Sequence, residues 1–145
     1  MRRLGILFIS VLLLHMLGAC EFETSSDGNL YGYWHLESID TLNGGFCDTH
    51  NQLLFWAVQA NILECSDRDY AHSPVVYKFE ESDGKLILSH PVLNDREKGD
   101  PEVTELGRVQ PFGIGSLEPV YDIEKLKTDR LVISDGQLRL SFRKL

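Results

Sequence analysis

The feature that most constrains the fold is a pair of Asp-Gly dipeptides, Asp83-Gly84 and Asp135-Gly136, each set between two short runs of alternating apolar and polar residues. Asp-Gly suits a type I′ turn, because both central residues of that turn need a positive φ. The runs on either side have the two-residue period of half-buried strands. Two β-hairpins in an antiparallel sheet are therefore predicted.

The inward and outward faces of these hairpins agree along their length. A two-residue loop in the first hairpin gives these pairs: Phe79 with Leu88, Tyr77 with His90, and, on the other face, Lys78 with Ser89. The same loop in the second hairpin gives Ile133 with Leu138 and Leu131 with Leu140 inward, and Val132 with Arg139 and Arg130 with Ser141 outward. Because cross-strand partners share a face, each hairpin is predicted to bury one side.

Further strands are predicted from other alternating segments. Residues 31–39 alternate so that Trp34 and Leu36 share one face. Residues 53–65 indicate two strands that meet near residues 59–61, although a helix also fits this apolar run. Residues 120–126 alternate more weakly and indicate another short strand.

The remaining segments are turns and loops. Residues 41–50 contain Asn-Gly-Gly and predict a loop, and residues 102–106 fit one helical turn. Residues 110–119 carry two prolines and two glycines between apolar side chains, which indicates a lid or a plug packed over another part of the fold. About seven short strands with little helix predict either a sandwich or a closed barrel.

The N-terminal segment has the pattern of a secretory leader. Arg2 and Arg3 precede an apolar run over residues 4–17, which is too short for a membrane-spanning helix. The run ends in Leu17-Gly18-Ala19-Cys20, which resembles the lipobox of bacterial lipoproteins. We therefore expect cleavage after residue 19 and lipidation of Cys20. Residues 20–29 are polar and acidic and are predicted to be a flexible tether to one domain over residues 30–145.

Composition excludes some partners. The chain carries 22 acidic against 14 basic side chains, a net charge of −8, and two of the basic ones, Arg2 and Arg3, leave with the leader. This excess of acidic side chains argues against binding to nucleic acid and against binding of a polybasic segment to anionic lipid. We expect a lipid-anchored protein of the bacterial cell envelope at the outer membrane, facing either the periplasm or the cell surface.

Two cysteines remain after Cys20. Cys47 and Cys65 are an even pair in an oxidising compartment, which predicts a disulfide. The alternative is a zinc site that joins Cys47 with His50 and Cys65 with His72, but the seven-residue spacing of the second pair matches no familiar zinc pattern. If the Cα atoms lie too far apart, the two cysteines are separate thiols.

A family resemblance covers both ends of the mature chain. Gly32-Tyr33-Trp34 has the G-x-W pattern, and residues 126–133 and 138–144 form the closing segments. These features resemble the lipocalin-like lipoproteins of Bacteroidetes, many of which have no assigned function. The resemblance implies a small antiparallel β-barrel of about seven to eight strands. It also implies that Trp34 seals one end beneath a basic residue, Arg143 or Lys144.

Motifs of catalysis are missing from the sequence. It contains no glycine-rich phosphate loop, nucleophile elbow or H-E-x-x-H motif, and its histidines are widely spaced. We therefore predict no enzymatic activity, no catalytic residue, no cofactor and no metal site.

Two hypotheses of function follow. The first is a binding module whose barrel holds a small apolar or amphipathic ligand, lined by the following residues: Trp56, Tyr77, Phe79, Leu88 and His90. Its mouth is expected near residues 110–119. The second is an interaction protein with a solid barrel that contacts another component of the envelope. The large side chains predicted to point inward favour the solid barrel.

Overall fold

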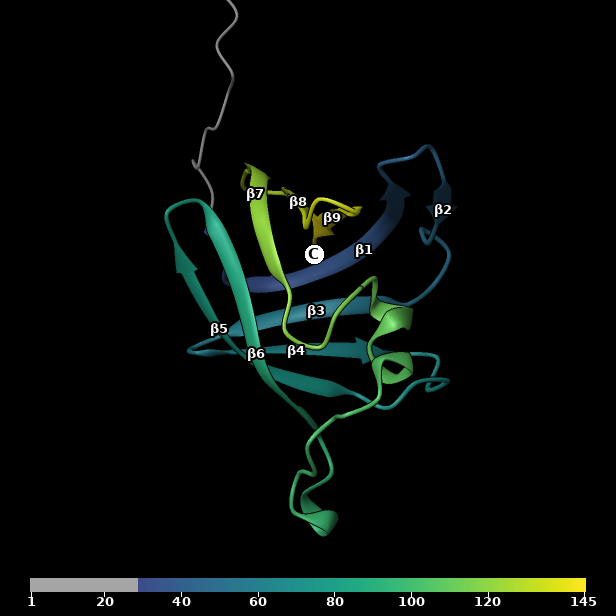
Figure 1. Ribbon diagram of the computed structural model, residues 1–145, viewed down its shortest axis with the longest axis vertical. Helices are drawn as coiled ribbons and strands as arrows, with labels where there is room; N and C mark the ends of the chain where they lie inside the picture. Colours follow the sequence, from purple (N-terminus) through teal and green to yellow (C-terminus); the bar gives the residue numbers. More distant parts are fainter. Residues whose placement is uncertain (1–28) are drawn as a thin grey trace, which may run out of the picture.

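A computed structural model describes residues 29–145 of the chain (Figure 1). The predicted leader over residues 1–19, the lipidation site Cys20 and all of the predicted tether except Asn29 lie outside the described residues. Within residues 29–145, no helix is long and apolar enough to cross a membrane.

Nine antiparallel strands form one sheet in this part of the chain. In chain order they are β1 Gly32–Thr41, β2 Phe46–Asp48, β3 Leu54–Gln59, β4 Ile62–Asp67, β5 Val75–Ser82, β6 Lys85–Leu93, β7 Val120–Leu126, β8 Arg130–Ser134 and β9 Leu138–Lys144. From β3 to β9 each strand pairs with the next, and β1 pairs with both β3 and β9, which closes the ring. The fold is therefore a closed eight-stranded barrel with β2 added outside β1 (Figure 1), which confirms the predicted all-β barrel.

The first predicted hairpin is confirmed at its turn. Asp83 and Gly84 have φ values of 52° and 71°, as a type I′ turn requires, and they join β5 to β6. Phe79 pairs with Leu88 as predicted, and Lys78 pairs with Ser89.

The predicted pairing of Tyr77 with His90 is wrong. The register between β5 and β6 shifts between Val76 and Lys78, which places one extra residue on β6. His90 is this extra residue. Its backbone has a φ of 53° and its side chain is exposed, whereas Pro91 is buried. A β-bulge of this kind re-aims the side chains beyond it, so His90 points away from the barrel interior.

The second hairpin has the predicted faces but a different register. Ile133 pairs with Leu140 and Leu131 with Phe142, two residues further along β9 than predicted. The Asp135 carboxylate accepts hydrogen bonds from the backbone N–H groups of Gln137 (2.9 Å) and Leu138 (2.8 Å). These bonds hold a four-residue loop instead of a two-residue one. A shift of two residues leaves every side chain on its original face.

Other loop predictions changed in detail. The turn between β3 and β4 lies at Ala60, as predicted, but β2 lies in the segment expected to be a loop. The helical turn expected over residues 102–106 lies instead at the 3₁₀ helix η2, Leu106–Arg108. Two more 3₁₀ turns are η1, Arg96–Lys98, and η3, Gln110–Phe112.

The predicted disulfide is wrong, because both cysteines of the described chain are free. Cys65 is completely buried on β4, where it pairs with Trp56 of β3 and Val75 of β5. Cys47 is exposed on β2, outside the barrel ring. Burial raises the pKa of the Cys65 thiol well above its ordinary value, so this thiol is poorly reactive.

Candidate ligand site in the barrel interior

The barrel interior contains three of the five residues predicted to line a ligand site. Trp56, Tyr77 and Leu88 are buried to within 1 % of complete burial and belong to one apolar cluster. Phe79 is partly buried and packs edge-on against Tyr31, with ring centroids 6.4 Å apart. His90 lies outside, for the reason given above, and the prediction that it lines the site is wrong.

Large side chains fill this interior. Those with less than 2 % exposure include the following aromatic residues: Trp34, Trp56, Tyr77, Phe112, Tyr121 and Phe142. Trp56 packs against two of them, with its ring centroid 4.9 Å from Phe142 and 6.0 Å from Tyr121. Water-sized space beside such residues would expose part of their surface, so the interior is tightly packed around them.

The segment from η2 to Pro119 closes the barrel end where an open mouth was expected. Val109, Phe112 and Ile114 are buried to within 1 %, and the Trp56 indole Nε1 donates a hydrogen bond to the Phe112 carbonyl oxygen (3.2 Å). Figure 1 shows this green segment beside the ends of β3 and β4. Of the two predicted roles, lid or plug, the structure has a plug.

Gly113 allows the plug to lie close to the barrel wall. Its φ of 81° is in the left-handed region, and a Cβ atom there would come within 2.8 Å of the Leu140 Cδ2 atom. Glycine is the residue that accepts both conditions without strain. The close approach of this backbone to β9 therefore depends on the absence of a side chain.

Two hydroxyl groups in the interior have no hydrogen-bond partner in the described part of the chain. They belong to Tyr77 on β5 and Tyr121 on β7, both of which are 0 % exposed. Burial raises the pKa of both phenols far above the ordinary value, and the nearby Cys65 adds to this effect. Both groups therefore stay protonated at neutral pH as hydrogen-bond donors. An unpaired buried donor costs about 1–3 kcal/mol, so such groups call for a partner.

Of the two basic residues expected to lie over Trp34, Arg143 is the wrong one. Lys144 pairs with Trp34 across β1 and β9, and its Nζ atom lies 4.8 Å from the centroid of the indole ring. Arg143 is one position earlier, so its side chain points to the outer face and donates to Glu37 (2.8 Å). The Lys144 alternative is therefore the correct one.

Two pockets open on the surface away from this interior. One, of about 450 Å³, is lined by residues between Glu64 and Pro74, and the other, of about 490 Å³, by residues of the β1–β2 and β8–β9 loops. A group of possible metal ligands, His35, Glu37 and His50, also lies outside the interior. Sequence reasoning missed this group, although the His-x-Glu spacing on a predicted strand already places two of its members on one face.

Comparison with known proteins gives the following similarities. A family model described as a lipocalin-like domain matches residues 14–145. A lipocalin-like protein from Bacteroides uniformis ATCC 8492 has a similar fold, with a TM-score of 0.60 at 17 % identity, over 81 % of this chain and 100 % of that one. An uncharacterized protein from Bacteroides eggerthii DSM 20697 gives a TM-score of 0.58 at 16 % identity with the same coverage. No curated protein matches the chain.

Proposed function

Because this chain belongs to the lipocalin-like domain family, we propose that it is a lipid-anchored, non-enzymatic protein of the bacterial cell envelope that binds a small amphipathic molecule inside its barrel. The observation that carries this proposal is the pair of unpartnered hydroxyl groups of Tyr77 and Tyr121 in an otherwise apolar interior. Such a pair suits a ligand that has a large apolar part and one hydrogen-bond acceptor, for example a carbonyl or a carboxylate oxygen.

The packed interior determines how a ligand would enter. Phe112 is the aromatic side chain that the plug inserts into the core, and its segment carries Gly107 and Gly113 on either side. Withdrawal of the Phe112 ring would leave an aromatic-sized space in the apolar cluster of the interior. The ligand then replaces the Phe112 ring, and the two tyrosine hydroxyls bind its polar group.

The lipid anchor is supported by Leu17-Gly18-Ala19-Cys20 at the end of an apolar leader. We expect radiolabelled palmitate to be incorporated into the full-length protein expressed in a bacterium, and Cys20→Ala to abolish the label. Cys47→Ala is the matched control, because this cysteine lies in the folded domain. Equal labelling of the wild type and Cys20→Ala would refute an anchor at this position.

The ligand hypothesis is tested by native mass spectrometry of residues 21–145, which contain every strand of the barrel. The protein is secreted to an oxidising compartment and weighed before and after denaturation. We expect a discrete adduct that is lost on unfolding. The double variant Tyr77→Phe/Tyr121→Phe keeps both rings, and we expect it to carry no adduct.

The same double variant separates binding from stability. In protein freed of any adduct by denaturation and refolding, removing an unpartnered buried hydroxyl is expected to raise the free energy of unfolding, by about 1 kcal/mol for each tyrosine, in urea titrations. A variant that is more stable but carries no adduct places the two hydroxyls in the binding site. A variant that is less stable shows that the hydroxyls already have partners, such as ordered water, and contradicts the proposal.

A second candidate function is favoured by the packing of the interior. With six aromatic side chains at less than 2 % exposure, a solid barrel whose outer surface contacts another envelope protein also fits the structure. A bare polypeptide mass in the experiment above would favour this candidate over a tightly bound ligand. Pull-downs of the lipidated protein would then identify the partner.

A further inference from the structure

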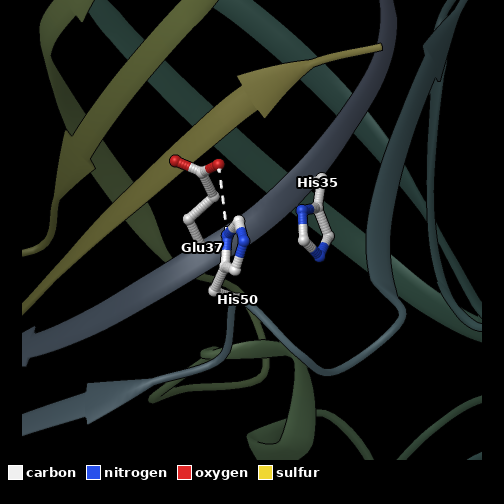
Figure 2. A group of neighbouring side chains, drawn as sticks. All are labelled: His35, Glu37 and His50. Carbon is white, nitrogen blue, oxygen red and sulfur yellow. Dashed lines mark ion pairs between the residues drawn. The ribbon is translucent and has the colours of Figure 1, made fainter.

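We propose that His35, Glu37 and His50 form a binding site for a divalent transition metal ion, with Zn²⁺ as the ion of choice, on the outer face of the barrel (Figure 2). The potential ligand atoms of these three side chains all lie within 4.8 Å of one another. Two imidazole nitrogens and one carboxylate oxygen form a common ligand set for zinc, with a fourth position open to water. The site is separate from the barrel interior.

The strand β1 supplies two of the ligands. His35 and Glu37 are two residues apart, so both side chains point to the outer face. The register between β1 and β9 shifts between Leu36 and Ser38, which places Glu37 at a β-bulge. Bulges re-aim side chains and are common beside functional sites.

His35 is held as metal-binding histidines usually are. It is only 5 % exposed and packs against Phe55, with ring centroids 5.0 Å apart. Its Nε2 atom lies 2.8 Å from the backbone carbonyl oxygen of Gln52. A carbonyl only accepts, so Nε2 carries a proton and Nδ1 is the ring nitrogen left to bind a metal ion. A backbone carbonyl that fixes the tautomer in this way is the usual outer partner of a metal-binding histidine.

The third ligand comes from the loop between β2 and β3, which is fastened to β1. Thr49 is 2 % exposed, and its hydroxyl donates to the Leu36 carbonyl oxygen (2.7 Å), while its N–H donates to the Glu37 carbonyl oxygen (3.0 Å). His50 follows directly, and its N–H is held by Asp48 (2.9 Å). Figure 2 shows the His50 ring beside the Glu37 carboxylate, where the distance from Nδ1 to Oε1 is 3.6 Å.

A small contraction of the group is needed to bind zinc. Zinc lies about 2.0–2.2 Å from its nitrogen and oxygen ligands, so two ligand atoms on one ion are at most about 4.4 Å apart, slightly less than the 4.8 Å within which the three groups now lie. The side chain of His50 is 58 % exposed, so a change of rotamer can bring it toward the ion. His35 is packed and Glu37 is held by arginines, so these two side chains have less room to adjust than His50.

The two arginines beside Glu37 have opposing effects on zinc binding. Burial raises the pKa of Glu37, but hydrogen bonds from Arg143 and Arg130 outweigh burial and lower it overall, so the carboxylate is ionised at neutral pH. A carboxylate has enough lone pairs to accept both arginines and still bind a metal ion. Two guanidinium groups nearby repel a cation, however. Removing Arg143 is therefore expected to strengthen zinc binding.

The test is isothermal titration of residues 21–145 with ZnCl₂ at pH 7.5, in a Cys47→Ser background that removes the exposed thiol. We expect one zinc ion per chain. His35→Ala and His50→Ala should each weaken binding by at least about 10- to 100-fold, the range that loss of even an outer partner of a metal ligand produces. His90→Asn is the matched control, because His90 is exposed elsewhere at a positive φ that asparagine tolerates, and it should leave zinc binding unchanged.

Two further results decide the proposal. Arg143→Gln should bind zinc more tightly than the wild type, which a purely structural cluster would not do. Since His50 is exposed, His50→Ala should unfold at the temperature of the wild type without metal, so that lost binding cannot be a loss of folding. Absence of one-to-one binding by the wild type, or equal binding by His50→Ala, would overturn the proposal.

Discussion

Replacing Trp34 with alanine is expected to lower the free energy of unfolding by about 3–5 kcal/mol, the usual cost of removing a large aromatic side chain from a core. Trp34 is 0 % exposed, and its Nε1 atom donates to the Leu30 carbonyl oxygen (2.7 Å). The substitution leaves a cavity and an unpaired buried carbonyl at one end of the barrel. Urea unfolding measures the effect. The unfolding is monitored by circular dichroism, because this signal does not depend on either tryptophan.

Two neighbouring substitutions show whether the seal is assigned to the correct residue. Lys144→Ala removes the cation above the Trp34 ring and is expected to cost about 0.5–2 kcal/mol. Arg143→Ala breaks a partly exposed ion pair with Glu37 and is expected to cost no more than about 1 kcal/mol. In the Trp34→Ala background, the effect of Lys144→Ala should shrink and that of Arg143→Ala should not. The reverse coupling would restore Arg143 as the sealing residue.

Replacing Phe112 with alanine is expected to destabilise the fold by a similar amount, about 3–5 kcal/mol, and to open the barrel interior. Its ring is 0 % exposed, and Phe112 is the last residue of η3 in the middle of the plug. The backbone carbonyl that accepts the Trp56 hydrogen bond is retained in the variant, so the measurement reports the loss of the ring alone. Urea unfolding gives the change in stability.

The same variant connects the plug to the proposed ligand. If the ligand replaces the Phe112 ring, Phe112→Ala should bind the amphipathic dye 1-anilinonaphthalene-8-sulfonate more strongly than the wild type while it remains folded. Leu117→Ala is the control, because Leu117 is a partly buried residue of the same segment. Equal dye binding by all three proteins would mean that the plug does not control access to the interior.

Local patterns were sufficient for most of the barrel. The Asp83-Gly84 turn, the inward Trp34 and Leu36, and the division of residues 53–65 into two strands all follow from residue period and turn chemistry. These properties depend on neighbours within a few residues. The resemblance of Gly32-Tyr33-Trp34 to the lipocalin pattern distinguished the barrel from the sandwich that the strand count also allowed.

The errors come from bulges, loop hydrogen bonds and strand placement that the apolar period does not encode. His90 left the predicted lining because a bulge placed Pro91 inward, and the second hairpin moved by two residues because Asp135 binds two backbone N–H groups of its own loop. The disulfide between Cys47 and Cys65 was predicted from an even number of cysteines in an oxidising compartment. In the structure, Cys47 lies on β2, outside the barrel ring, and Cys65 lies on β4, which is part of the ring. None of these arrangements changes the apolar period from which the strands were predicted.

The sequence by itself determined which segments are strands and which side of each strand is buried, because alternation and turn residues act over a few neighbouring positions. Only the tertiary structure decided which residues of different strands and loops meet on the buried and exposed sides. Ring closure between β1 and β9 set Lys144 over Trp34, the plug brought Phe112 to Trp56, and the hydrogen bonds of Thr49 brought His50 to Glu37. Both candidate sites arise from such contacts between residues far apart in the chain, which no local pattern specifies.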